Sequence, residues 1–103
     1  MHLTRQMFEK NRDTKFWLED AEGSRAALDL VEVRNGQAPP RYEVFSVIFR
    51  GEADRIHPQR TYTVEHEAMG SFDLFLVPVG RDPHGVLYEA VFNRAIDAQS
   101  EVA

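Results

Sequence analysis

The sequence predicts an all-β fold with one short helix, namely a six-stranded antiparallel meander curled into a small barrel or a sandwich. Three observations predict it. From residue 15 onward, apolar and polar residues alternate, as they do in strands with one buried face. The 6 glycines fall in or beside the segments that separate these alternating runs. Short connections between consecutive strands favour antiparallel neighbours.

A short helix is predicted ahead of the strands. Thr4 can act as its N-cap, and Leu3 and Phe8 have the spacing of a hydrophobic staple. The charged residues 9–13 end it. Because a helix this short is marginal on its own, we expect it to cover one end of the sheet.

The strands are expected at residues 15–20, 25–34, 42–50, 60–68, 72–79 and 85–93. In the second of them the apolar phase slips by one between Leu30 and Val31, which indicates a β-bulge. Pro78 has no N–H to donate, so the fifth strand should lie at an edge or be bulged near its end.

The length of the chain is that of one domain. The 103 residues are expected to form a single β domain over residues 1–94, followed by a frayed tail at residues 95–103. A core of this size needs no metal or disulfide for stability. The chain has no cysteine, which excludes disulfides, thiolate nucleophiles and cysteine-ligated zinc.

The charge pattern bears on the class of partner. Seventeen acidic residues against 12 basic ones give a net charge of −5, and the basic residues are spread singly along the chain. Nucleic-acid binding is therefore not expected. Every apolar run is far shorter than the ~18 residues of a membrane span. The N-terminal residues lack the apolar core of a signal peptide, so a cytoplasmic location is expected.

The densest group of catalytic side-chain types is Glu65-His66-Glu67. Strand alternation turns His66 toward the apolar side with Tyr62 and Val64, and turns both glutamates the other way. They cannot then ligate one ion together with His66, so no metal site is predicted. We expect His66 to be an inward, hydrogen-bonded histidine; the alternative is a position at the mouth of a small cavity.

Other motifs of catalysis are missing from the sequence. It has no GxSxG elbow, HxH or HExxH spacing or glycine-rich phosphate loop, so no catalytic residue, no cofactor and no enzymatic activity are predicted. Glu89 lies in the apolar run LYEAVF, and a buried carboxylate requires a partner. Arg50 or Arg81 is expected to be that partner.

The aromatic residues divide between the core and the surface. Trp17 is expected on the outer face of its strand, because Phe16 and Leu18 occupy the inner one, and an exposed tryptophan is typical of a partner surface. If the sheet does not close, the first strand and the strand with Pro78 are free edges for pairing. Four aromatic residues are expected in the core: Phe72, Phe75, Tyr88 and Phe92.

Four segments carry a family resemblance: FRG at 49–51, PQRTYTVEH at 58–66, GSFDLFLVPVGRD at 70–82 and YEAVFN at 88–93. Over residues 8–93 the chain resembles a family of small uncharacterised bacterial proteins, defined as a domain of unknown function. The resemblance implies no catalytic residue. It does imply an accessory role in a phage-tail-like assembly.

The sequence as a whole predicts a non-enzymatic interaction or structural module. Its partner is expected to be another protein, a component of a tail-like assembly or a second copy of the chain. The residues singled out for interaction are Trp17, His66 and Glu89. The alternative function is a small-ligand-binding barrel with its mouth near His66 and Glu89.

Overall fold

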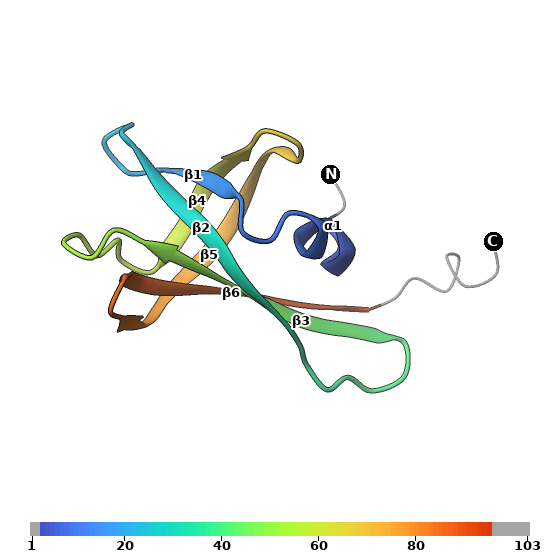
Figure 1. Cartoon of the computed structure of the whole chain (residues 1–103). Helices are drawn as coiled ribbons and strands as arrows, with labels where there is room; N and C mark the ends of the chain where they lie inside the picture. Colours follow the sequence, from blue (N-terminus) through green and yellow to red (C-terminus); the bar gives the residue numbers. More distant parts are fainter. Residues whose placement is uncertain (1–2, 96–103) are drawn as a thin grey trace.

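The computed structural model describes residues 3–95, which form one short helix and six antiparallel strands (Figure 1). The predicted fold class and the number of strands are confirmed. No helix within this range has the length and apolar character needed to cross a lipid bilayer. The elements are α1 (Arg5–Lys10), β1 (Lys15–Glu19), β2 (Arg25–Asn35), β3 (Tyr42–Gly51), β4 (Arg60–His66), β5 (Gly70–Asp82) and β6 (Gly85–Ala95).

The strands form a closed ring made of two three-stranded meanders. Strands β1, β2 and β3 pair in sequence, as do β4, β5 and β6. The halves join where β3 pairs with β6 and β1 pairs with β4, giving the order β1-β2-β3-β6-β5-β4. The predicted meander therefore holds within each half. Strands β3 and β4 are not neighbours, because residues 52–59 carry the chain across one end of the ring.

Because the ring is closed, the first strand has no free edge; such an edge was expected only for an open sheet. Strand β1 has β2 on one side and β4 on the other, with Trp17 opposite both Ala27 and Glu65. Strand β5 pairs with β4 through its first half and with β6 through its last part, where a register shift lies between Pro78 and Gly80. The predicted bulge at the proline is confirmed.

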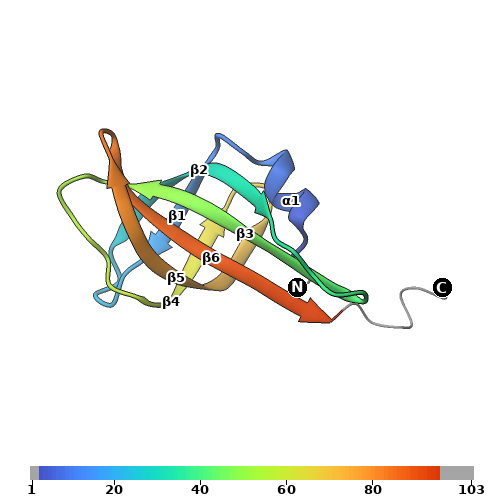
Figure 2. The ribbon, with the colours of Figure 1, turned by 90° about the horizontal axis from the view of Figure 1, so that it is seen from below.

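Helix α1 covers one end of the ring, and the loop of residues 52–59 covers the other (Figure 2). The Thr4 side chain caps the helix by accepting the N–H of Met7 at 3.2 Å. Phe8 is completely buried and lies against the rings of four phenylalanines, with centroid distances of 5.5–6.3 Å. These four are Phe16, Phe45, Phe72 and Phe92.

Side chains that alternate along each strand fill the ring. Phe72, Leu74 and Leu76 of β5 point inward and are buried. The expectation that Phe75 belongs to the core is wrong: it lies between two inward residues, faces outward and is 51% exposed. The inward set of β4 ends at His66, and the buried side chain in the following turn is Met69.

The bulge in β2 agrees with the prediction, and the end of β6 differs from it. A register shift between Leu30 and Glu32 confirms the bulge in β2. Strands β3 and β6 pair from Gly51↔Val86 to Tyr42↔Ala95 and extend past α1 (Figure 2). Ala95, predicted to begin the tail, is the last residue of β6, and residues 96–103 lie outside the described residues.

Candidate functional site

Trp17 lies on the outer face of β1, as its strand phase predicts. Its neighbours Phe16 and Leu18 point into the ring and are completely buried. Trp17 itself is half-buried because Arg25 of β2 covers part of it: the guanidinium carbon lies 4.8 Å from the centre of the indole ring. This is the distance of a cation–π contact, which holds the indole in place.

A hollow surrounds the indole on the surface of β1 and β4. It consists of two adjoining depressions of about 390 and 550 Å³, both bordered by Trp17, His66 and Glu67. We call this surface the Trp17 hollow. Its remaining residues are Arg25 and Glu65 in the first depression, and Asn11, Thr14, Lys15 and Ala68 in the second.

The charges around the Trp17 hollow do not balance. Arg25 pairs with Glu65 at 3.5 Å, and Lys15 pairs with Asp29 at 4.0 Å. Glu67 is exposed and has no ion-pair partner among residues 3–95. The charge left over beside the indole is therefore negative.

His66 borders both depressions and is only 7% exposed. Its Nδ1 accepts the backbone N–H groups of Ala68 at 3.0 Å and Met69 at 3.2 Å, so the ring proton sits on Nε2. Nε2 donates to the hydroxyl of Thr14 at 2.8 Å, and that hydroxyl donates to the carbonyl of Asn11 at 2.5 Å. The predicted inward, hydrogen-bonded histidine is confirmed.

The surroundings of His66 keep it neutral. Burial lowers the pKa of His66, and the nearby charge of Glu67 opposes this only in part. Phe16 packs on the imidazole with ring centroids 4.2 Å apart. With both nitrogens engaged, the ring has no lone pair to offer a metal ion. Within residues 3–95, no three histidine, aspartate or glutamate side chains are grouped to hold one.

The ion pair predicted for Glu89 is wrong. Arg50 instead pairs with Asp82, with Nη2 2.6 Å from Oδ2. Arg81, the other predicted partner, is exposed, and Glu89 has no ion-pair partner in the part of the chain that the structure describes. The prediction failed for two reasons. The sequence does not give the strand register, which brings Arg50 of β3 and Asp82 of β5 together across β6. It also does not show on which face of β6 Glu89 lies.

Glu89 and His66 do not share the mouth of a cavity. Glu89 is half-buried on the outer face of β6, opposite Ile48 of β3 and Val77 of β5. His66 points inward from β4, and β5 separates the two strands in the ring. Of the three residues singled out in the sequence, the structure brings together Trp17 and His66.

Arg25, the charged residue that packs on the indole, was not predicted from the sequence, whereas Glu65 and Glu67 were noted only as outward neighbours of His66. Arg25 reaches the indole because β1 and β2 form a hairpin in which Glu19 pairs with Arg25. Strand alternation could have identified Arg25. In the β1–β2 hairpin, residues opposite each other share a face, so Glu19 and Trp17 on β1 place Arg25 on the outer face of β2. Glu67 lies in the turn after β4, where alternation ends.

A family model described as Domain of unknown function (DUF6916) matches residues 3–92. Searches among the curated proteins and among the solved structures return no match to the chain. The matched segment spans α1 and all six strands except the last residues of β6, so the resemblance seen in the sequence extends over the whole ring. The chain therefore belongs to the family described as Domain of unknown function (DUF6916).

Proposed function

We propose that this chain is a non-enzymatic protein-interaction module, an accessory of a larger assembly, whose Trp17 hollow binds a basic side chain of a protein partner. The observation that carries the proposal is a fixed, outward indole in a hollow whose unpaired charge is negative. Tryptophan is enriched among the residues that dominate binding energy at protein interfaces.

The shape of the site supports a protruding side chain as the occupant. Trp17, His66 and Glu67 line both depressions, so a group entering the larger one lies beside the indole and near the free carboxylate. An arginine or lysine side chain can pack its aliphatic stem and its charge against an indole. It would at the same time supply the missing partner of Glu67.

The charge of the whole chain acts in the same direction. The net charge is −5, and charges of opposite sign on two partners speed up their encounter and select among competitors. Binding through this site should therefore weaken as the salt concentration rises.

The state of His66 supports binding rather than catalysis at this site. A general base must be free to take up a proton from its substrate. His66 instead uses Nδ1 to hold the turn after β4 and Nε2 to hold Thr14. Its place in the Trp17 hollow is that of a rigid wall beside the indole.

The decisive experiment compares variants for their capture of the native partner. The tagged chain, Trp17→Ala and Glu67→Gln are used as baits in the native host, and captured proteins are identified by mass spectrometry. The same protein should be lost from both variants and kept by Glu52→Gln, which removes an exposed charge outside the hollow. With the purified partner, Trp17→Ala should weaken binding at least about tenfold, or ~1.4 kcal/mol.

The basic side chain is tested from the other side of the interface. Replacing the partner's interfacial arginine or lysine by glutamine should abolish the difference between the wild-type chain and Glu67→Gln. The circular dichroism and melting temperature of Glu67→Gln should equal those of the wild type. A partner that binds all three baits equally would refute the proposal.

A further inference from the structure

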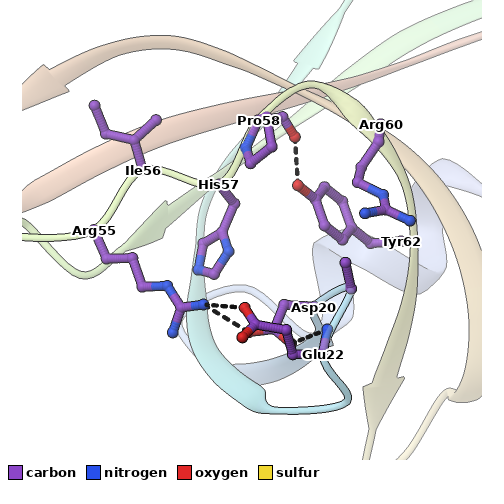
Figure 3. Close-up of a pocket in the computed structure, with 9 residues that line it drawn as sticks. Asp20, Glu22, Arg55, Ile56, His57, Pro58, Arg60 and Tyr62 are labelled. Atoms are coloured by element: carbon purple, nitrogen blue, oxygen red, sulfur yellow. Dashed lines mark hydrogen bonds and ion pairs between the residues drawn. The ribbon is translucent and has the colours of Figure 1, made fainter.

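A second pocket lies at the end of the ring opposite α1, where residues 52–59 cross from β3 to β4 (Figure 3). Its volume is about 200 Å³. We call it the His57 pocket, after the buried side chain that points into it. Its lining residues are Asp20, Ala21, Glu22, Arg55, Ile56, His57, Pro58, Arg60 and Tyr62.

The loop that forms this pocket is tied to the ring at two points. The backbone N–H of His57 donates to the hydroxyl of Tyr88 at 2.8 Å. The hydroxyl of Tyr62 donates to the carbonyl of Pro58. These bonds come from β6 and β4, so the walls of the pocket are set by the same strands that form the core.

The negative charge of Asp20 is already used within the pocket. Its Oδ1 accepts the backbone N–H groups of Glu22 and Ser24, each at 2.9 Å. Its Oδ2 accepts Nη2 of Arg55 at 2.7 Å. The carboxylate of Glu22 is 82% exposed and lies 4.0 Å from the same nitrogen, so it contributes little.

Several donors remain without acceptors. His57 is only 4% exposed, yet neither of its ring nitrogens has a hydrogen-bond partner within residues 3–95. No polar side-chain atom of these residues is both sealed from solvent and unpaired, so the imidazole must reach solvent through the pocket. The guanidinium carbon of Arg60 lies 5.5 Å from the centre of the Tyr62 ring. None of the guanidinium N–H groups has an acceptor among the described residues.

The pocket therefore offers donors without acceptors, the guanidinium of Arg60 among them, beside a small apolar wall; its lining holds two guanidinium and two carboxylate groups. Arg60 and the imidazole N–H supply the donors, and the remaining N–H groups of Arg55 add to them. Ala21, Ile56 and Pro58 form the apolar part. Carboxylates are the acceptors that a guanidinium fork fits best.

From this arrangement we infer that the His57 pocket binds a carboxylate group on a short aliphatic stem, held by the unpaired guanidinium of Arg60. The volume admits one small group and is below the usual 300–1,000 Å³ of pockets for larger organic ligands. A free short-chain acid and the carboxyl end of a peptide share this chemistry. The site is separate from the Trp17 hollow, and no residue lines both.

The test uses two carboxylates, each with a neutral control of the same shape. Butanoate and acetyl-glycyl-alanine are titrated into the ¹⁵N-labelled full chain, and butanamide and the amidated dipeptide serve as controls. Both ligands are followed by the backbone amide resonances of Ile56, His57 and Glu22. At least one carboxylate should shift these resonances to saturation, and its amide should not.

The outcomes distinguish a free acid from a peptide terminus as the ligand, and they test whether Arg60 holds it. Saturation by butanoate alone identifies a free acid as the ligand, and tighter binding of the dipeptide identifies a peptide terminus. Arg60→Ala, a change at an exposed residue, should weaken binding at least about tenfold. Arg12→Ala, an exposed arginine next to α1, should leave it unchanged. No saturation, equal binding of the amides, or equal weakening in both variants overturns the inference.

Discussion

Replacing His66 with phenylalanine separates the hydrogen bonds of this residue from its packing. The new ring keeps the contact with Phe16 but has no nitrogen. The amide of Met69, which is buried, and that of Ala68, which is partly buried, then lose their acceptor. An unpaired buried amide costs about 1–3 kcal/mol. Because Thr14 keeps its bond to Asn11, the expected loss in free energy of unfolding is about 2–4 kcal/mol in total.

The matched control is His66→Asn. The side-chain oxygen of asparagine can occupy the position of Nδ1 and accept the same two amides. Hydrogen exchange at Ala68 and Met69 should therefore stay slow in His66→Asn and become fast in His66→Phe. Denaturant unfolding gives the free energies, and amide exchange tells whether the turn is the part that was lost.

The pH dependence of stability provides a second, independent measurement. Burial lowers the pKa of His66 below its ordinary value of 6.5, so the unfolded chain takes up the proton first as the pH falls. The stabilising contribution is complete above about pH 6.5 and is lost as the pH falls below it, by at most about 1.4 kcal/mol per pH unit for one proton. Burial, together with the charge of Arg55, lowers the pKa of His57 in the same direction.

The wild-type chain should thus lose stability between pH 6.5 and 5 through both histidines, and His66→Phe should lose it through His57 alone. The slope of unfolding free energy against pH in this window must be smaller in the variant. An unchanged slope, or a loss of less than about 0.5 kcal/mol at pH 7.5, would show that His66 does not hold the turn as described.

Three further substitutions test other parts of the ring. Glu89→Gln should change the free energy of unfolding by less than about 0.5 kcal/mol, since no ion pair is broken; a large loss in urea unfolding would reveal a buried partner. Asp82→Ala should cost about 2–3 kcal/mol, because it frees Arg50 and removes the cap of the β5–β6 turn; Asp82→Asn, which keeps the cap, should recover part of the loss. Gly85→Ala should lower stability by about 1–3 kcal/mol, since the added Cβ overlaps the carbonyl oxygen of Gly51; an unchanged melting temperature would contradict the close approach of β3 and β6.

The elements of the fold could be predicted from the sequence because each depends on local pattern. Thr4 and Phe8 mark the start of the helix, and the phase slip after Leu30 marks the bulge of β2. Phe75 shows the limit of that approach. An aromatic residue favours the core in general, yet the position of Phe75 between two inward leucines turns it outward, because strand alternation outweighs the general preference of a residue type.

The candidate sites depend on which strands pair and in which register, and neither can be read from the composition of the chain. Trp17 could be placed on the outer face from its two neighbours alone. The partner of Arg50 could not be predicted, because Asp82 reaches it only through the register of β3 on β6 and β6 on β5. The His57 pocket needs the crossing loop, the β1–β2 turn and β4 at one end of the ring. Its residues are spread from Asp20 to Tyr62 and share no motif.

Closure of the ring has a consequence for the order in which this chain folds. Four of the strand pairs are hairpins between consecutive strands and can form early, whereas β3–β6 and β1–β4 join residues far apart in sequence. Such pairings slow folding relative to a helical chain of equal length. Until the five residues of β1 are in place, β2 and β4 expose unpaired backbone. The same segment from a second chain can fill that gap, so refolding at high concentration should produce dimers that exchange α1 and β1.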